Sequence, residues 1–207
     1  MGPLARDVTS PRTFAVTWDY RCPFARNAHE HVVAGLRSGA DWEVTFVPFS
    51  LGQVHVAEGE PDIWDRWRDD SGLLALQAGV VVRDLFPERF LDVHEALFAL
   101  RHEHGGQLRD DASVRAALTA QGVDAEAVLA DIDGGGAIIR VQQEHERAVK
   151  DHSVWGVPTF VIGEEAAFVR VMDRPTDGAH AVATIERILD LLGSPALNEF
   201  KHTTIPR

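Results

Sequence analysis

The feature that most constrains the fold is an apolar segment that passes directly into a helical pattern near the start of the chain. Residues 14–18 (FAVTW) are apolar or β-branched almost without a break, which is typical of a strand covered on both faces. From residue 23 to residue 37, apolar side chains recur every fourth position, and Gly39 supplies a stop. Residues 42–49 then show a second strand pattern. This order predicts two parallel strands joined by a right-handed crossover.

Cys22 lies between the first strand and the helix, and it is the only cysteine among the 207 residues. A lone cysteine is usually a small buried hydrophobic residue. Here, however, Pro23 occupies a first helical position, so the thiol would feel unpaired backbone N–H groups and the positive end of the helix dipole. Such surroundings lower a thiol pKa from about 8.5 to between roughly 3.5 and 7.5. We therefore predict a reactive thiolate at Cys22.

The middle of the chain is predicted to be entirely helical. Helical patterns are found at residues 61–68, 73–86, 88–104, 112–121, 124–131 and 137–152. Strand character returns at residues 159–162 and, after a short turn, at residues 167–171, which predicts a hairpin. A last helix, capped by Thr176 or Asp177, is expected to end at Gly193.

These patterns divide the chain into one domain that carries an insertion. We place its first part at residues 12–52, the helical insertion at 60–152, its second part at 153–193 and a tail at 194–207. Residues 1–12 are polar and are expected to form a loose leader.

Net charge and composition limit the classes of molecule that the protein is expected to bind. The formal net charge of -12 argues against nucleic acid or an anionic membrane, and it favours a small or neutral ligand. No N-terminal stretch pairs a basic start with an apolar run, and no segment approaches the roughly 18 apolar residues of a membrane span, so we expect a cytoplasmic protein. The sequence leaves a homodimer open.

Two motifs carry a resemblance to a known family. The sequence CPF at residues 22–24 follows an apolar strand, and GVPT at residues 156–159 precedes the third strand, with the helical block between them. Together they resemble the DsbA-like thioredoxin family over nearly the whole chain. The resemblance implies an α/β thioredoxin fold with an all-helical domain inserted between the second strand and a cis-proline loop. It also implies that Pro158 is cis and lies beside Cys22. Residues 199–204 (EFKHTT) resemble the tail of actinobacterial mycothiol-dependent reductases.

Ala25 stands where the usual motif of that family has its second cysteine. A two-thiol cycle is therefore impossible within one chain, and monothiol chemistry remains. The Cys22 thiolate would attack a disulfide made by a small thiol, much as monothiol glutaredoxins do. Alternatively, Cys22 would stay unreacted and anchor a bound thiol cofactor, as residues at this position do in the similar kappa-class glutathione transferases and hydroxychromene-carboxylate isomerases.

Other residues are expected to line the site with Cys22. A cis Pro158 would leave the N–H and C=O of Val157 exposed at an edge, where an extended thiol ligand could pair with them. Pro23 and Phe24 would face that ligand from the motif, although Phe24 would serve equally well as a hydrophobic filler.

Two pairs of larger side chains complete the predicted site. Arg21 and Arg26 flank Cys22 and would favour its thiolate or hold a carboxylate, unless they are simply solvated. Trp64 and Trp67, one helical turn apart, would line a pocket over Cys22, although core packing is the commoner role of such a pair.

The ten histidines do not indicate a metal site. The pairs His29 with His31 and His102 with His104 are two residues apart, and alternate residues on a helix point well apart. Solvated helix faces explain these pairs better, and we expect no metal. Either His145 or His152 would approach the site from the helix that precedes the loop of Pro158.

Three functions fit these patterns. We favour a cytoplasmic monothiol oxidoreductase or thiol transferase that acts on a small apolar substrate. It would use a low-molecular-weight thiol, mycothiol or glutathione, as co-substrate, with no tightly bound cofactor. The second function is a kappa-class-like isomerase or transferase in which the cofactor thiol does the chemistry. The third is a binding protein that kept the fold and lost the redox cycle.

Overall fold

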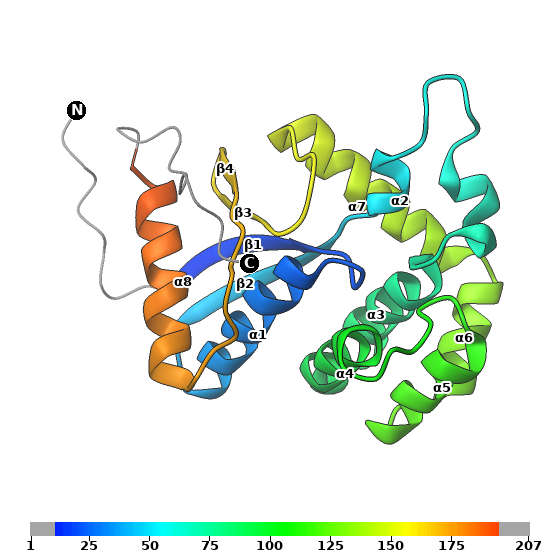
Figure 1. Cartoon of the computed structure of the whole chain (residues 1–207), viewed down its shortest axis with the longest axis horizontal. Helices are drawn as coiled ribbons and strands as arrows, with labels where there is room; N and C mark the ends of the chain where they lie inside the picture. Colours follow the sequence, from blue (N-terminus) through cyan, green and yellow to red (C-terminus); the bar gives the residue numbers. More distant parts are fainter. Residues whose placement is uncertain (1–10, 195–207) are drawn as a thin grey trace.

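The computed structural model describes residues 11–194, so the tail and nearly all of the leader lie outside the described residues (Figure 1). The first strand, helix and strand are β1 (Arg12–Trp18), α1 (Pro23–Arg37) and β2 (Trp42–Pro48). After α2 (Leu51–Val54), the insertion comprises the 3-10 helix η1 (Ile63–Asp69), α3 (Leu73–Leu85), the 3-10 helix η2 (Pro87–Arg89), α4 (Phe90–His102), α5 (Asp111–Ala120), α6 (Ala125–Asp133) and α7 (Gly136–His152). The chain closes with β3 (Thr159–Ile162), β4 (Glu165–Phe168) and α8 (Gly178–Leu192).

The four strands form one sheet in the order β2-β1-β3-β4. Strands β1 and β2 are parallel, with Arg12 opposite Trp42, whereas β3 is antiparallel to β1 and to β4. The predicted crossover and hairpin are therefore confirmed. The predicted bounds of the second hairpin strand, 167–171, are wrong. Gly163 has a φ of 59°, which closes a tight turn and lets β4 begin at Glu165.

Helices flank the sheet, and most of them belong to the insertion. Helices α1 and α8 pack against each other beside the strands, and the insertion lies at the other end of the molecule (Figure 1). Helix α4 contacts α1 and helix α7 contacts β2, so the insertion is joined to the sheet on two sides. Among residues 11–194, no helix combines the length and the apolarity that crossing a membrane requires.

One hydrophobic core runs from the sheet into the insertion. Phe14, Val16 and Trp18 alternate along β1 with their side chains buried, and the Trp18 ring packs against Phe90 of α4 at a centroid distance of 6.1 Å. Residues 73–82 of α3 are all buried, which makes α3 the central helix of the insertion. The β1–α1 connection, where Cys22 lies, is thus packed from both parts of the molecule.

Candidate active site

Cys22 is the N-cap of α1. Its Sγ accepts a hydrogen bond from the N–H of Ala25 at 3.4 Å, and its S–H donates to the carbonyl oxygen of Val157 at 3.4 Å. Pro23 is the first helical residue and is exposed. The peptide bond between Val157 and Pro158 is cis. The structure therefore brings the two motifs of the sequence together at the sulfur of Cys22.

The pKa of Cys22 is raised, not lowered, relative to its ordinary value. Burial is the largest cause, because only 9% of the residue is exposed, and the negative charge of Asp19 acts in the same direction. The backbone N–H groups of Ala25 and Phe24 and the charge of Arg170 oppose this shift without reversing it. The prediction of a thiolate near neutrality is therefore wrong. That prediction was based on the position of Cys22 at the start of the helix and did not include the burial of its sulfur.

The carbonyl group of Val157 already has a hydrogen-bond partner. The side chain of this residue is buried, with 2% of the residue exposed, and its carbonyl oxygen accepts the S–H of Cys22. The carbonyl oxygen of Pro158 is also occupied, because it accepts the N–H of Val169 at 3.0 Å. The carbonyl group expected to pair with a ligand thus already accepts the thiol, whereas the N–H of Val157 makes no hydrogen bond within residues 11–194.

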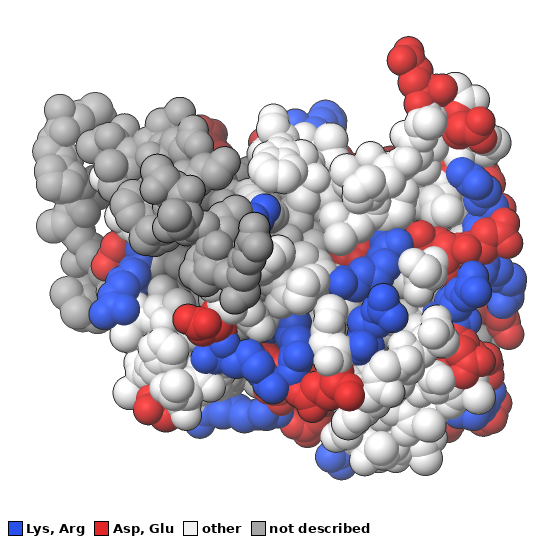
Figure 2. All heavy atoms as spheres, in the orientation of Figure 1, with Lys and Arg blue, Asp and Glu red and all other residues white. Residues whose placement is uncertain are grey.

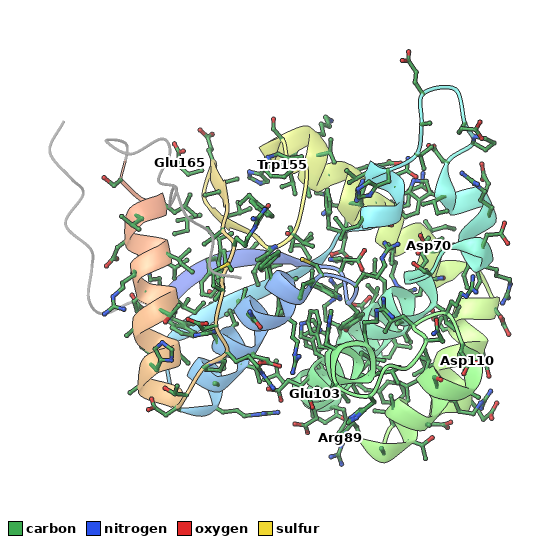
Figure 3. All side chains as sticks on the ribbon, viewed as in Figure 1. Asp70, Arg89, Glu103, Asp110, Trp155 and Glu165 are labelled. Carbon is green, nitrogen blue, oxygen red and sulfur yellow. The ribbon has the colours of Figure 1, made fainter. Side chains whose placement is uncertain are left out.

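Arg21 is committed to carboxylates of the protein. It binds Asp19 at 2.5 Å and Asp70 at 2.8 Å, and Asp19 also accepts the N–H of Leu51 at 2.8 Å. Figure 3 labels Asp70 in the insertion, so this network ties the loop before Cys22 to the helical part. Its charge is balanced within the fold.

Arg26 is neutralised in the same way, because it pairs with Glu30 at 2.8 Å and with Glu103. Neither arginine that flanks Cys22 in the sequence offers an unbalanced charge to the sulfur. The sequence placed them correctly along the chain but could not show their partners.

Arg170 is the basic residue that acts on Cys22, and the sequence analysis did not identify it. Its guanidinium lies over the ring of Phe24, 4.8 Å from the ring centroid, and its charge favours the Cys22 thiolate. Arg170 is exposed, and it makes no ion pair with any residue of the described range. It follows β4, far from Cys22 along the chain, so only the hairpin brings the two together.

Trp155 is a second site element that the sequence analysis left out. It is 63% exposed and stacks on Phe168 of β4, with the ring centroids 4.5 Å apart. Figure 3 shows it on the segment between α7 and β3, just before the cis-proline loop. A tryptophan this exposed, held by a second aromatic ring, is a ready platform for a ligand.

Trp64 and Trp67 are not brought to Cys22. Trp64 is buried against His145, with ring centroids 5.4 Å apart. Trp67 carries the guanidinium of Arg68 at 4.2 Å and lines a shallow cavity inside the insertion. Trp64 is thus part of the core and Trp67 belongs to the insertion, so the core-packing alternative describes the pair better.

A buried chain of hydrogen bonds lies on the inner side of the same loop. The Nε2 of His29 lies 3.0 Å from the carbonyl oxygen of Thr17, and its Nδ1 lies 2.8 Å from the Nε2 of His94. The Nδ1 of His94 lies 2.8 Å from the hydroxyl of Tyr20. We call Tyr20, His94 and His29 the inner chain.

The direction of each bond in the inner chain follows from the carbonyl at its end. A carbonyl only accepts, so the Nε2 of His29 carries the hydrogen and its Nδ1 accepts from the Nε2–H of His94. The Nδ1 of His94 then accepts the hydroxyl hydrogen of Tyr20. Burial lowers the pKa of His29 to about 4 and holds the pKa of His94 well below its usual range, which fits two neutral rings.

The expectation of solvated histidines is therefore wrong for His29 and His31, each of which is 1% exposed. His102 lies 2.9 Å from the carbonyl oxygen of Tyr20, whereas His104 is exposed. Within the described part of the chain, no three His, Cys, Asp or Glu side chains are grouped as metal ligands would be.

His145 is buried beside Phe49, with their ring centroids 4.2 Å apart, and its Nδ1 accepts the N–H of Ser50 at 3.2 Å. Burial lowers its pKa to about 4. The structure thus gives His145 a place in the core and no contact with Cys22.

Comparison with known proteins places this site in a family context. A family model described as the DSBA-like thioredoxin domain matches residues 15–187. The uncharacterized protein Rv2286c of Mycobacterium tuberculosis is 25% identical over 193 residues, covering 91% of this chain and 81% of the relative.

Solved structures share the fold at low sequence identity. BdbD of Bacillus subtilis matches with a TM-score of 0.60 and 18% identity over 91% of this chain and 92% of its own. A thioredoxin-like oxidoreductase from Silicibacter pomeroyi matches with a TM-score of 0.57 and 17% identity over 86% of each chain. DsbA of Pseudomonas aeruginosa matches with a TM-score of 0.56 and 18% identity over 91% of this chain and 88% of its own.

Proposed function

The chain belongs to the DSBA-like thioredoxin domain family of oxidoreductases, and from that premise we propose that it is a monothiol thiol-disulfide oxidoreductase or thiol transferase with Cys22 as its nucleophile. The observation that carries the proposal is the position of this sulfur. It caps α1, touches the loop of the cis-proline through Val157, and has Ala25 where a resolving thiol would stand.

One sulfur supports a balanced exchange cycle if a small thiol resolves it. The Cys22 thiolate attacks one sulfur of a disulfide R–S–S–R′, which forms Cys22–S–S–R and releases R′–S⁻. A second R–S⁻ then attacks the R sulfur, which gives R–S–S–R and regenerates the Cys22 thiolate. In the net reaction, R–S–S–R′ and R–S⁻ give R–S–S–R and R′–S⁻, so one R thiolate is oxidised to the disulfide level, the R′ sulfur is reduced to the thiolate, and Cys22 ends unchanged.

The resting thiol sets the pH dependence of this cycle. Since burial raises the pKa of Cys22, only a minority of molecules carry the thiolate at neutral pH. A thiolate with a raised pKa is intrinsically more nucleophilic, which offsets part of that loss. The N–H groups of Ala25 and Phe24 and the charge of Arg170 are the groups that stabilise the thiolate when it forms.

We propose a low-molecular-weight thiol, mycothiol or glutathione, as co-substrate, with no tightly bound cofactor. A small apolar substrate suits the surface between the β3–β4 hairpin and the insertion, which is largely uncharged in the view of Figure 2. Charged side chains crowd the lower part of that face instead. The cytoplasm, where thiols stay reduced, suits a protein with one cysteine.

A second function is favoured by the hydrogen bond from Cys22 to Val157. A thiol that stays protonated can donate to the sulfur of a bound thiol cofactor, and the cofactor then does the chemistry. This is the kappa-class-like isomerase or transferase. It predicts that Cys22→Ser keeps much of the activity, because a hydroxyl also donates.

The deciding experiment is intact-protein mass spectrometry after incubation with oxidised glutathione and with mycothiol disulfide. Because the chain has one cysteine, an adduct of one thiol reports on Cys22 alone. The proposal expects this adduct, its release by the reduced thiol, and loss of thiol transfer by at least about a hundredfold in Cys22→Ser. An unmodified Cys22 refutes it. Thiol-dependent turnover that survives in Cys22→Ser establishes the second function.

A further inference from the structure

The charges around Cys22 are balanced with one exception. Arg21 is bound to Asp19 and Asp70, and Arg26 is bound to Glu30 and Glu103. Arg174, which lies on the loop after β4, pairs with Glu30 at 2.5 Å and with Glu103 at 3.0 Å. Arg170 makes no ion pair within residues 11–194.

Lack of an ion pair does not by itself distinguish Arg170, because other exposed arginines such as Arg147 and Arg187 also make none within residues 11–194. What distinguishes Arg170 is its place, because its charge favours the Cys22 thiolate.

The geometry of Arg170 suits an anionic ligand group. Its guanidinium is held over the ring of Phe24, 4.8 Å from the centroid. Stacking of this kind occupies the face of the guanidinium and leaves its N–H edge available for a carboxylate, which it can bind through two parallel hydrogen bonds. Phe24 also follows Pro23 in the motif, so the stacked pair is fixed relative to Cys22.

The surroundings extend this pair into a subsite. The Val169 N–H bonds to the carbonyl oxygen of Pro158, which ties the residue between Phe168 and Arg170 to the cis-proline loop. Trp155 stacks on Phe168. Arg170 and an exposed aromatic platform are thus both connected to the cis-proline loop through residues 168–170.

We propose that Arg170, stacked on Phe24 and two residues along the chain from the Phe168–Trp155 pair, is an anion-binding subsite that takes a carboxylate of the thiol co-substrate. This inference rests on the proposed function for the identity of the ligand as a thiol. It assigns the co-substrate to the carboxylate-bearing class, of which glutathione is a member. A neutral thiol such as mycothiol gains nothing from Arg170.

Calorimetric titration with S-methylglutathione tests the subsite without any exchange reaction, because this probe carries the carboxylates and has no reactive sulfur. We expect Arg170→Gln to weaken its binding about three- to tenfold, and added salt to weaken binding to the wild type. Arg187→Gln, which removes the same charge from an exposed position on α8, is the matched control and should bind like the wild type. No binding to the wild type, or equal binding by Arg170→Gln, overturns the subsite.

Reaction of Cys22 with two aromatic disulfides provides the second measurement. Dithiobis(nitrobenzoate) is a dianion and dithiodipyridine is neutral, and both are attacked by the same thiolate. The ratio of their rates therefore cancels any change in thiolate fraction. We expect Arg170→Gln to lower the ratio of the anionic to the neutral rate about three- to tenfold, and Arg187→Gln to leave it unchanged. An equal fall in both variants contradicts the subsite.

These two measurements separate the subsite from the proposed function. If Cys22 forms no mixed disulfide with any small thiol while S-methylglutathione still binds through Arg170, the exchange cycle fails and the subsite stands. If exchange proceeds with both reagents and the ratio does not depend on Arg170, the subsite fails and the exchange cycle stands.

Discussion

The two sides of the β1–α1 connection differ in how their polar groups are used. On the inner side, each ring nitrogen of His29 and His94 has a hydrogen-bond partner. On the outer side, the Cys22 sulfur bonds Val157 and Ala25, but Arg170 has no ion pair in the described range and Trp155 is 63% exposed. The inner groups, whose hydrogen bonds are all made within the protein, hold the loop in place, whereas Arg170 and Trp155 are available to a ligand.

The inner chain also packs closely against α3. Tyr20 is two residues before Cys22, and its hydroxyl lies where a Cβ on Gly79 would come within 2.3 Å of it, so Gly79 of α3 allows the close approach. The inner chain thus fastens the loop of Cys22 to α1, α3 and α4 at once. Removing it should affect stability before it affects chemistry.

Replacing His94 by Leu should give the largest loss of stability, because it leaves the Tyr20 hydroxyl and the Nδ1 of His29 buried without partners. We expect the free energy of unfolding to fall by about 2 to 4 kcal/mol. Urea unfolding at neutral pH, followed by circular dichroism, measures it.

His94→Gln is the matched control, because a glutamine amide can donate to His29 and its oxygen can accept from Tyr20. It should recover at least half of the lost stability. If His94→Leu and His94→Gln destabilise the protein equally, the hydrogen bonds of the inner chain do not contribute to stability. The inner side would then be held by packing alone.

The pH dependence of stability sharpens the same contrast. The pKa of His29 is about 4 in the folded state and about 6.5 when unfolded, because burial disfavours its charged form. As pH falls below 6.5 the unfolded chain binds a proton that the folded chain does not, so stability decreases, and this contribution levels off below the folded pKa. Between about pH 7.5 and about pH 5, one such histidine accounts for a loss of about 2 kcal/mol.

The variant His29→Gln isolates this contribution from the other titrating groups. Urea unfolding of the wild type and the variant at about pH 7.5 and about pH 5 should show a smaller acid-induced loss in the variant, by about 2 kcal/mol. An identical loss in both proteins would show that the pKa of His29 is not lowered in the folded state. Cys22 contributes little to this comparison, since burial raises its pKa and it stays protonated throughout.

The fold was predictable because its signals are local. A continuous apolar run gave β1, four-residue periodicity gave α1, and Asp177 with Gly193 marked the ends of α8. The parallel and antiparallel pairings followed from the order of these elements. The bounds of β4 were missed because a tight turn at Gly163 is decided by one backbone angle, which hydrophobic periodicity does not report.

The site was only half predictable, because its electrostatics depend on contacts between distant segments. The sequence found Cys22 and Pro158, whose residue types carry their own chemistry. It assigned the positive charge near Cys22 to Arg21 and Arg26. Adjacency along the chain cannot show that Asp70 and Glu103 neutralise these arginines. Arg170 gave no signal of its own, and the pKa of Cys22 depended on burial that no local pattern encodes.

The smallest predicted effect concerns Trp155, the most exposed aromatic residue of the outer side. Trp155→Ala removes the platform and leaves Arg170 in place, so it should slow the reaction of Cys22 with anionic and neutral aromatic disulfides by the same factor, about threefold. Stability should change by less than about 0.5 kcal/mol, because the side chain is mostly in solvent. Stopped-flow rates with both reagents measure the first effect and urea unfolding the second. A large loss of stability with unchanged rates would instead show that Trp155 has a structural role, and Arg170 would then be the outer-side residue left available to a ligand.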